Sequence, residues 1–237
     1  MEVSTPGRIC LFGEHQDYLG LPVIAAAISL RTTIKAKRKI EPIIKIYKPN
    51  LNETEVFDLN DLTYLHSREY FKSGIKVCKK LGFKFSSGIS CTVKSDIPFQ
   101  AGCSSSSSIM VSWIYLLSKF ADNPINLSLK KLGELAYCAE VIEFNEPGGM
   151  MDQYTTSIGN ILYIESHPVL SIKKLNPKLG FFILGDSKES KNTISILNRC
   201  KEERLRVFKK LNLNKDDISC ISFSSFKNSL ENEDLSI

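Results

Sequence analysis

Residues 7–20 read GRICLFGEHQDYLG, and this stretch bears most directly on the fold. The apolar run that ends at Phe12 is typical of a buried strand, and Gly13 stops it. Glu14, His15 and Asp17 then follow within four positions. Three titratable side chains at the end of a buried strand are unusual, and they raise the question of what these side chains bind. The alternative to binding is a turn whose polar side chains satisfy one another.

The composition is that of a soluble globular protein with a substantial core. The 237 residues are 43% hydrophobic and 24% charged. The net charge of +5 is spread along the chain without a dense basic stripe, so we expect no nucleic-acid partner. A mild positive excess also suits a small polyanionic molecule.

The N-terminus and the cysteines bear on the compartment. Residues 1–9, MEVSTPGRI, lack the basic and apolar segments of a secretory signal, and no stretch is long and apolar enough to span a bilayer. The seven cysteines include no CxxC pair, which disfavours zinc. Cys10, Cys91 and Cys138 sit inside apolar runs as small core residues, which fits a reducing compartment better than a disulfide framework. We therefore expect a cytoplasmic protein with no membrane partner.

The hydrophobic pattern predicts a mixed order of strands and helices, which is the α+β class. Strands are expected at residues 8–12, 22–28, 88–98, 159–165 and 181–187, with a hairpin formed by 30–39 and 43–47. Helices are expected over 64–81, 104–120, 128–144 and 193–211. Ser128 is predicted to cap its helix, and Gly82 to follow the end of another. A change of lobe is expected near residues 166–178.

A run of five serines joins a predicted strand to a predicted helix in residues 96–120, DIPFQAGCSSSSSIMVSWIYLLSKF. The first turn of a helix offers unpaired N–H groups and a positive dipole end, and small residues such as Gly102 let a phosphate approach. Serine hydroxyls add donors and can ligate magnesium. The run has no Gly-Lys-Ser/Thr, so it is not a Walker loop. A serine-rich cap on a core helix is the alternative.

Acidic residues and paired glycines mark a third segment, residues 138–159, CAEVIEFNEPGGMMDQYTTSIG. Glu140 lies on an otherwise apolar helix face. Gly148 and Gly149 form a permissive turn, and Asp152 follows it. A carboxylate in this position suits a residue aimed into a cleft, although an Asx turn or a helix cap explains it equally well.

Taken together and in this order, the three segments resemble motifs of the GHMP kinase superfamily, and most closely those of its galactokinase branch. Residues 6–20 resemble a signature in which Gly-Arg opens an apolar strand that ends in Gly-Glu-His-x-Asp-Tyr. Residues 97–108, IPFQAGCSSSSS, resemble the phosphate loop Pro-x-x-x-Gly-Leu-Ser-Ser-Ser-Ala. Residues 148–153, GGMMDQ, resemble Gly-Ile-Met-Asp-Gln. The similarity covers most of residues 5–165.

The resemblance implies a two-lobed α+β fold. Residues 1–170 are expected to form a ribosomal-S5-domain-2-like lobe that binds sugar and ATP phosphates. Residues 171–237 are expected to form an incomplete ferredoxin-like C-terminal lobe. The implied activity is an ATP-dependent transfer of the γ-phosphate to the anomeric hydroxyl of a small-molecule sugar, with Mg²⁺ as cofactor.

The resemblance also implies roles for individual residues. Asp152 is expected to act as a general base or to orient the sugar hydroxyl, with Arg8 beside it. Sugar hydroxyls are expected to bond to the acidic turn, and a magnesium ion to Ser106 and Glu140. The turn residues are Glu14, His15 and Asp17, and the ATP phosphates are expected at Gly102, Ser104, Ser105, Ser106, Ser107 and Ser108.

Several departures from the family pattern bear on substrate and activity. Cys103 and Ser107 replace the usual Leu and Ala, and residues 186–191, with Asp186 as a candidate substrate contact, differ from the galactokinase pattern. The family's third, Gly-rich motif has no counterpart after Gly185. We therefore expect a fragment, a shortened product or a partner that supplies the rest.

Two alternatives to a galactokinase remain open on this reading. One is a GHMP kinase for another sugar, such as arabinose, a uronic acid, fucose or a heptose. The other is a catalytically silent sensor of sugar and nucleotide. The oligomeric state is left open.

Overall fold

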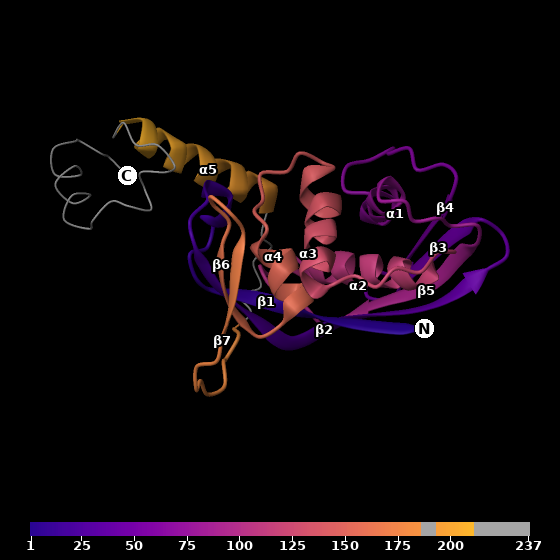
Figure 1. The fold of residues 1–237 in the computed structure, drawn as a ribbon, viewed down its shortest axis with the longest axis horizontal. Helices are drawn as coiled ribbons and strands as arrows, with labels where there is room; N and C mark the ends of the chain where they lie inside the picture. Colours follow the sequence, from indigo (N-terminus) through magenta and orange to yellow (C-terminus); the bar gives the residue numbers. More distant parts are fainter. Residues whose placement is uncertain (186–192, 211–237) are drawn as a thin grey trace.

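The computed structural model describes residues 1–185 and 193–210. It confirms the α+β class, with a mixed sheet and helices packed on it (Figure 1). The strands are β1 (Glu2–Phe12), β2 (Val23–Lys39), β3 (Ile43–Lys48), β4 (Glu53–Asp58), β5 (Gly88–Ser95), β6 (Ile161–Glu165) and β7 (Ser171–Leu175). The helices are α1 (Tyr70–Lys80), α2 (Ser105–Phe120), α3 (Leu129–Tyr137), α4 (Met151–Ile158) and α5 (Thr193–Lys210), with short turns η1 (Asp17–Leu19) and η2 (Cys138–Ile142).

The 17-residue strand β2 organises the sheet. One edge of β2 pairs with β1, and the other pairs with β6 near its start and with β5 near its end. The strand order is β4-β3-β5-β2-β6-β7, with β1 on the remaining edge of β2. Because both edges of β2 are paired, neighbouring strands on both sides fix its register. The register in turn decides which side chains of β2 face the core.

The predicted hairpin of residues 30–39 and 43–47 is wrong. Residues 22–28 and 30–39 belong to the single strand β2, and β5 lies between β2 and β3. β3 pairs in parallel with β5, where Ile44 opposes Ile89, and forms its hairpin with β4 instead. Parallel pairing requires a long crossover, here β4 and α1, which a local pattern does not reveal.

Four of the described helices agree with the prediction in place and differ at their ends, whereas α4 was not predicted. α2 and α5 lie within one residue of the expected ranges, whereas α1 begins at Tyr70 and α3 gives way to the π-helical turn η2 after Tyr137. The N-cap at Ser128 is confirmed, since its hydroxyl accepts from Lys131 N at 3.1 Å. Gly82 follows the end of α1 with φ of +87°, as predicted.

The later part of the chain differs more. The strand expected at 181–187 is wrong for residues 181–185, which form no strand and leave the Phe181 and Ile183 side chains exposed. Residues 186–187 and the candidate contact Asp186 lie outside the described residues. β7, which falls in the range expected for the second lobe, pairs with β6 of the main sheet. None of the described helices combines the length and apolarity needed to cross a membrane.

The core lies between the sheet and helices α1, α2 and α3. α2 is buried on nearly all sides because it lies between strands β1 and β2 and helices α1, α3 and α4, and its Trp113 is fully buried. Buried hydroxyls fix α2 to β1: Thr5 Oγ1 lies 2.7 Å from Ser112 Oγ and donates to Ser108 O at 2.8 Å. These bonds set where the serine-rich start of α2 lies relative to the end of β1.

Candidate active site

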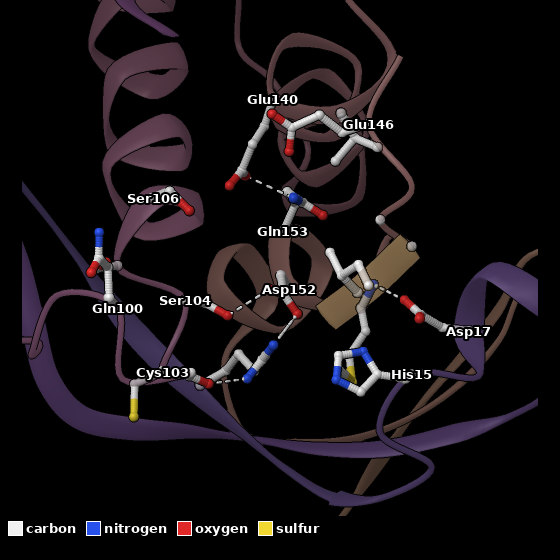
Figure 2. A pocket seen from close by; sticks show the side chains of 18 of the residues that line it. His15, Asp17, Gln100, Cys103, Ser104, Ser106, Glu140, Glu146, Asp152 and Gln153 are labelled. Atoms are coloured by element: carbon white, nitrogen blue, oxygen red, sulfur yellow. Dashed lines mark hydrogen bonds and ion pairs between the residues drawn. The ribbon is translucent and has the colours of Figure 1, made fainter. Parts of the chain in front are cut away.

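The three predicted motif segments meet around one cavity of about 220 Å³ (Figure 2). The turn after β1, the loop before α2, the η2 turn and the start of α4 contribute side chains to it. Ten of the predicted site residues line it: Arg8, Glu14, His15, Asp17, Gly102, Ser104, Ser105, Ser106, Glu140 and Asp152. Residues separated by more than a hundred positions are therefore neighbours, as the motif order predicts.

Ser107 and Ser108 are not at the cavity surface. Their side chains are buried, with exposed fractions of 1% and 0%. Ser108 Oγ donates to Thr5 O, and Ser107 Oγ accepts from Gln153 Nε2. Helical geometry turns these two side chains toward the core, and the expected contact of these positions with phosphate stays a prediction.

The loop before α2 leaves the first N–H groups of the helix available to a ligand. Its N-cap residue Ser104 has φ of +57° and makes no side-chain capping bond. The Ser104 hydroxyl instead donates to Asp152 Oδ2 at 2.7 Å. The structure therefore does not support the alternative of a simple serine cap, and it favours an anion site at the start of α2.

A glycine in β1 lets this loop approach the strand. Arg8 N donates to Cys103 O at 3.1 Å, next to a bulge between Pro6 and Arg8. A Cβ atom at Gly7 would lie only 2.7 Å from Cys103 O. Both residues of the Gly-Arg pair are therefore needed here. Gly7 leaves space for the loop, and Arg8 makes the contacts with it.

Arg8 and Asp152 form an ion pair at the floor of the cavity. Arg8 Nε donates to Asp152 Oδ1 at 2.7 Å, and Arg8 Nη2 lies 2.6 Å from the same oxygen. Arg8 is 6% exposed and also donates through Nη1 to Gly102 O. Burial alone would lower the pKa of Arg8, but the negative charges of Asp152 and Glu14 outweigh it and raise that pKa.

Asp152 points into the cavity and does not cap a helix. It is the second residue of α4, whose N-cap is Met150, and it makes no capping bond. Both carboxylate oxygens accept bonds, one from Arg8 and one from Ser104. The cap alternative for Asp152 is therefore not what the structure shows, and the expected contact with Arg8 is present.

Glu140 lies in the buried wall of the cavity and is 5% exposed. Gln153 Nε2 donates to Glu140 Oε2 at 2.7 Å, and the hydroxyls of Ser106 and Ser107 lie near enough to lower the pKa of this carboxylate. Burial raises the pKa of Glu140 to about 7, and the negative charge of Asp152 adds to the rise, against the lowering effect of these groups.

The residues around Glu140 fit a hard cation. The Ser106 hydroxyl lies near enough to the Glu140 carboxylate to lower its pKa, so two potential oxygen ligands lie close together at the cavity. Among the described residues, the buried Gln153 Oε1 next to them has no hydrogen-bond partner. Mg²⁺ commonly keeps waters and phosphate oxygens as ligands beside one or two protein oxygens, so a pair such as Ser106 and Glu140 is enough.

The acidic turn lies at the other end of the cavity. Asp17 is 9% exposed, and its Oδ2 accepts from Met151 N at 3.0 Å, the first residue of α4. Burial raises the pKa of Asp17 to about 6, although the Met151 bond opposes the rise. A Cβ at Gly149 would lie 1.9 Å from Asp17 Oδ2. The acidic turn and the turn before α4 therefore touch at this glycine. His15 has φ of +61°, and its Nε2 lies 3.8 Å from Glu14 Oε1.

Three residues that line the cavity, Arg68, Tyr70 and Leu197, lie outside the three predicted segments. Phe99, Gln100 and Glu146 lie inside these segments but were not singled out. Arg68 and Gln100 have positive φ angles, of +64° and +55°. His15 and Ser104, which line the same cavity, also have positive φ. Positive φ in non-glycine residues is costly and gathers at functional sites. Nothing in the residue types Arg and Gln signals this backbone conformation.

A second cavity of about 140 Å³ adjoins the first. The two share Arg68, Tyr70 and Phe99, and the second is lined mainly by apolar side chains, among them Phe71 and Val93. α5 reaches the first cavity through Leu197, and Arg204 on the same helix donates to the Tyr18 hydroxyl at 3.1 Å.

Family comparisons match the regions that build this site. The family described as "GHMP kinases N terminal domain" matches residues 69–160, and the "Galactokinase galactose-binding signature" matches residues 2–38. Together they cover the phosphate loop, Glu140, Asp152 and the acidic turn.

Individual relatives agree with the family match. A galactokinase of Limosilactobacillus reuteri is 30% identical over 89% of this chain and 58% of its own length. A mevalonate kinase of Thermococcus gammatolerans is 27% identical over 84% of this chain and 62% of its own length. The chain thus spans roughly three-fifths of the length of these relatives.

Solved structures show the same fold. Lactococcus lactis galactokinase complexed with galactose has a TM-score of 0.69 and 24% identity over 89% of this chain and 56% of its own. Methanococcus jannaschii mevalonate kinase has a TM-score of 0.65 and 27% identity over 75% of this chain and 56% of its own. With its motifs, fold and relatives in agreement, this chain belongs to the GHMP kinase superfamily and is galactokinase-like within it.

Proposed function

We propose that this chain forms the ATP- and sugar-binding part of a kinase that phosphorylates the anomeric hydroxyl of a monosaccharide. The observation that carries the proposal is the position of Asp152. Its carboxylate faces the cavity between the start of α2 and the acidic turn, held by Arg8 and Ser104. A carboxylate placed between an anion site and a hydroxyl-binding turn suits phosphoryl transfer from ATP to an alcohol.

The phosphates of ATP are assigned to the loop Gly102–Ser106 and the start of α2. Unpaired backbone N–H groups and the helix dipole there favour negative charge. The adjoining apolar cavity, with Phe71 and Val93 in its wall, is assigned to the base of the nucleotide. This arrangement directs the terminal phosphate toward Asp152.

Asp152 is assigned to orient the attacking sugar hydroxyl or to accept its proton. The Arg8 guanidinium, which pairs with Asp152 Oδ1 at 2.6 Å, is assigned to reduce the negative charge that builds up during transfer. Ser104 fixes the second carboxylate oxygen, so the carboxyl group has a defined orientation. Glu14, His15 and Asp17 are assigned to the sugar hydroxyls, because such groups accept and donate several bonds.

A magnesium ion would be held by Ser106 and Glu140, and when bound it supplies positive charge that neutralises the phosphates. Gln153 aligns the Glu140 carboxylate through its 2.7 Å bond. The raised pKa of Glu140 means that binding of a cation at neutral pH favours the release of a proton.

A sugar is favoured over mevalonate as the substrate by the acidic turn. Both galactokinases and mevalonate kinases are similar to this chain. The galactose-binding signature, however, matches residues 2–38, and the three polar residues of the turn line the cavity. A mevalonate site does not need this number of groups for hydroxyls.

The test is the release of ADP from MgATP by the purified chain, with galactose, other monosaccharides and mevalonate supplied one at a time. The Asp152→Asn chain serves as the matched control. We expect release that depends on a sugar and is lost in the control. Release with mevalonate alone would overturn the sugar assignment. If no acceptor gives release, the proposed activity is wrong for these residues, and binding of nucleotide and sugar without turnover would favour the sensor.

A further inference from the structure

Negative side chains outnumber positive ones in the cavity. Among the described residues that line it, five are carboxylates (Glu14, Asp17, Glu140, Glu146 and Asp152) and two are arginines (Arg8 and Arg68), with no lysine. Nucleotide phosphates carry several negative charges, so they need cationic partners in such a cavity. A single magnesium ion at Ser106 and Glu140 does not balance both sets of charges.

Arg8 is already committed to other groups. Its guanidinium bonds to Asp152 and to Gly102 O, and only 6% of the residue is exposed. Arg68 is the remaining arginine of the cavity. Its side chain is 34% exposed, and it lines both the main cavity and the apolar cavity beside it.

Arg68 is held in a defined orientation. Its Nε donates to Glu146 Oε1 at 2.6 Å and its Nη2 donates to Glu146 Oε2 at 2.8 Å. Its backbone has φ of +64°, and its carbonyl accepts from Tyr70 N at 2.7 Å where α1 begins. This pairing uses Nε and Nη2, and the Nη1 amino group is left for a further acceptor.

We propose that Arg68 binds a phosphate group of the nucleotide, with Glu146 as the residue that positions its guanidinium. The inference rests on the proposed kinase function and adds a residue that the motifs do not contain. The Nη1 amino group can donate to phosphate oxygens while Nε and Nη2 hold Glu146, and the guanidinium is charged at all relevant pH values. Its place between the two cavities is where the phosphates and the base of a nucleotide would join.

The test compares the binding of MgADP and of adenosine by calorimetry in the wild-type chain and in Arg68→Met. We expect MgADP to bind ~10- to 100-fold more weakly to the variant, as for the loss of a charged hydrogen bond, and adenosine to bind within about twofold of wild type. Lys45→Met, which removes an exposed charge on β3, is the control and is expected to bind both normally.

A second variant separates contact from structural damage, because Arg68→Met leaves the Glu146 carboxylate without its partner. In the double variant Arg68→Met/Glu146→Gln that stranded charge is absent. We expect MgADP binding to stay weak, and its recovery to wild-type strength would overturn the proposal.

Other outcomes also decide the question. Equal losses for MgADP and adenosine would show that Arg68 does not act through phosphate. Wild-type affinity for MgADP in Arg68→Met would overturn the inference and leave the kinase proposal intact. A wild-type chain that binds no nucleotide would overturn the kinase proposal and this inference with it.

Discussion

Replacing Glu140 by Gln removes a carboxylate that the fold holds in an unfavourable environment. Glu140 is 5% exposed, and burial raises its pKa from 4.5 to about 7. Gln is close in shape, and its amide oxygen can still accept the bond from Gln153 Nε2. The substitution therefore changes the charge with little change in packing.

The sign of the effect follows from proton binding. Native Glu140 holds its proton to higher pH than unfolded Glu140, so the native state carries more protons between pH 4.5 and about 7. The free energy of unfolding of the wild-type chain therefore falls as pH rises through this window. A shift of this size corresponds to about 3 kcal/mol, taking about 1.4 kcal/mol for each pKa unit.

We compare the free energy of unfolding of Glu140→Gln with that of the wild-type chain at each pH. We expect the difference, variant minus wild type, to rise by about 3 kcal/mol between pH 4 and pH 8. The assay is urea unfolding at a series of pH values, followed by the fluorescence of Trp113, the single tryptophan, which is fully buried. Asp17, whose pKa is also raised, acts in the same direction in both proteins and cancels in the comparison.

The exposed-carboxylate variant Glu53→Gln serves as the control and should follow the wild-type pH profile. Parallel stability profiles for wild type and Glu140→Gln would refute the reasoning, because they would mean that Glu140 titrates alike in the native and unfolded states. Under the proposed function, addition of Mg²⁺ with nucleotide at pH 8 stabilises the wild-type chain more than the variant.

The remaining predictions concern the catalytic carboxylate, the glycine turn and a helix cap. Asp152→Asn should keep sugar affinity, measured by calorimetry, while sugar-dependent ADP release drops by orders of magnitude; retained turnover would overturn the base assignment. Gly149→Ala should lower the free energy of unfolding by ~1–3 kcal/mol, because its Cβ would overlap Asp17 Oδ2, whereas Gly148→Ala, whose Cβ meets only ordinary contacts at 3.6 Å, should be nearly neutral in the same urea assay. Ser128→Ala should cost about 1 kcal/mol through loss of the cap bond, and an unchanged melting curve would contradict that role.

Local patterns predicted several of the individual elements, although β4, α4 and β7 were not among them. α2 and α5 follow from helical spacing, and the Ser128 cap follows from its residue type. The same patterns failed for the sheet, where β5 lies between β2 and β3. Strand pairing depends on which distant segment shares a face, and period-two alternation is the same for every candidate partner.

The sequence by itself determined the family and most of the cavity lining, because the motif residues are specific in type and order. Only the tertiary structure decided how they act on one another. It places Asp17 against Met151 across 134 positions, turns Ser107 and Ser108 into the core, and brings Arg68 with Glu146 to the cavity. The physical reason is that side-chain types and spacing are local properties, whereas burial, pKa and ion pairing are set by segments that meet only when the sheet and helices pack.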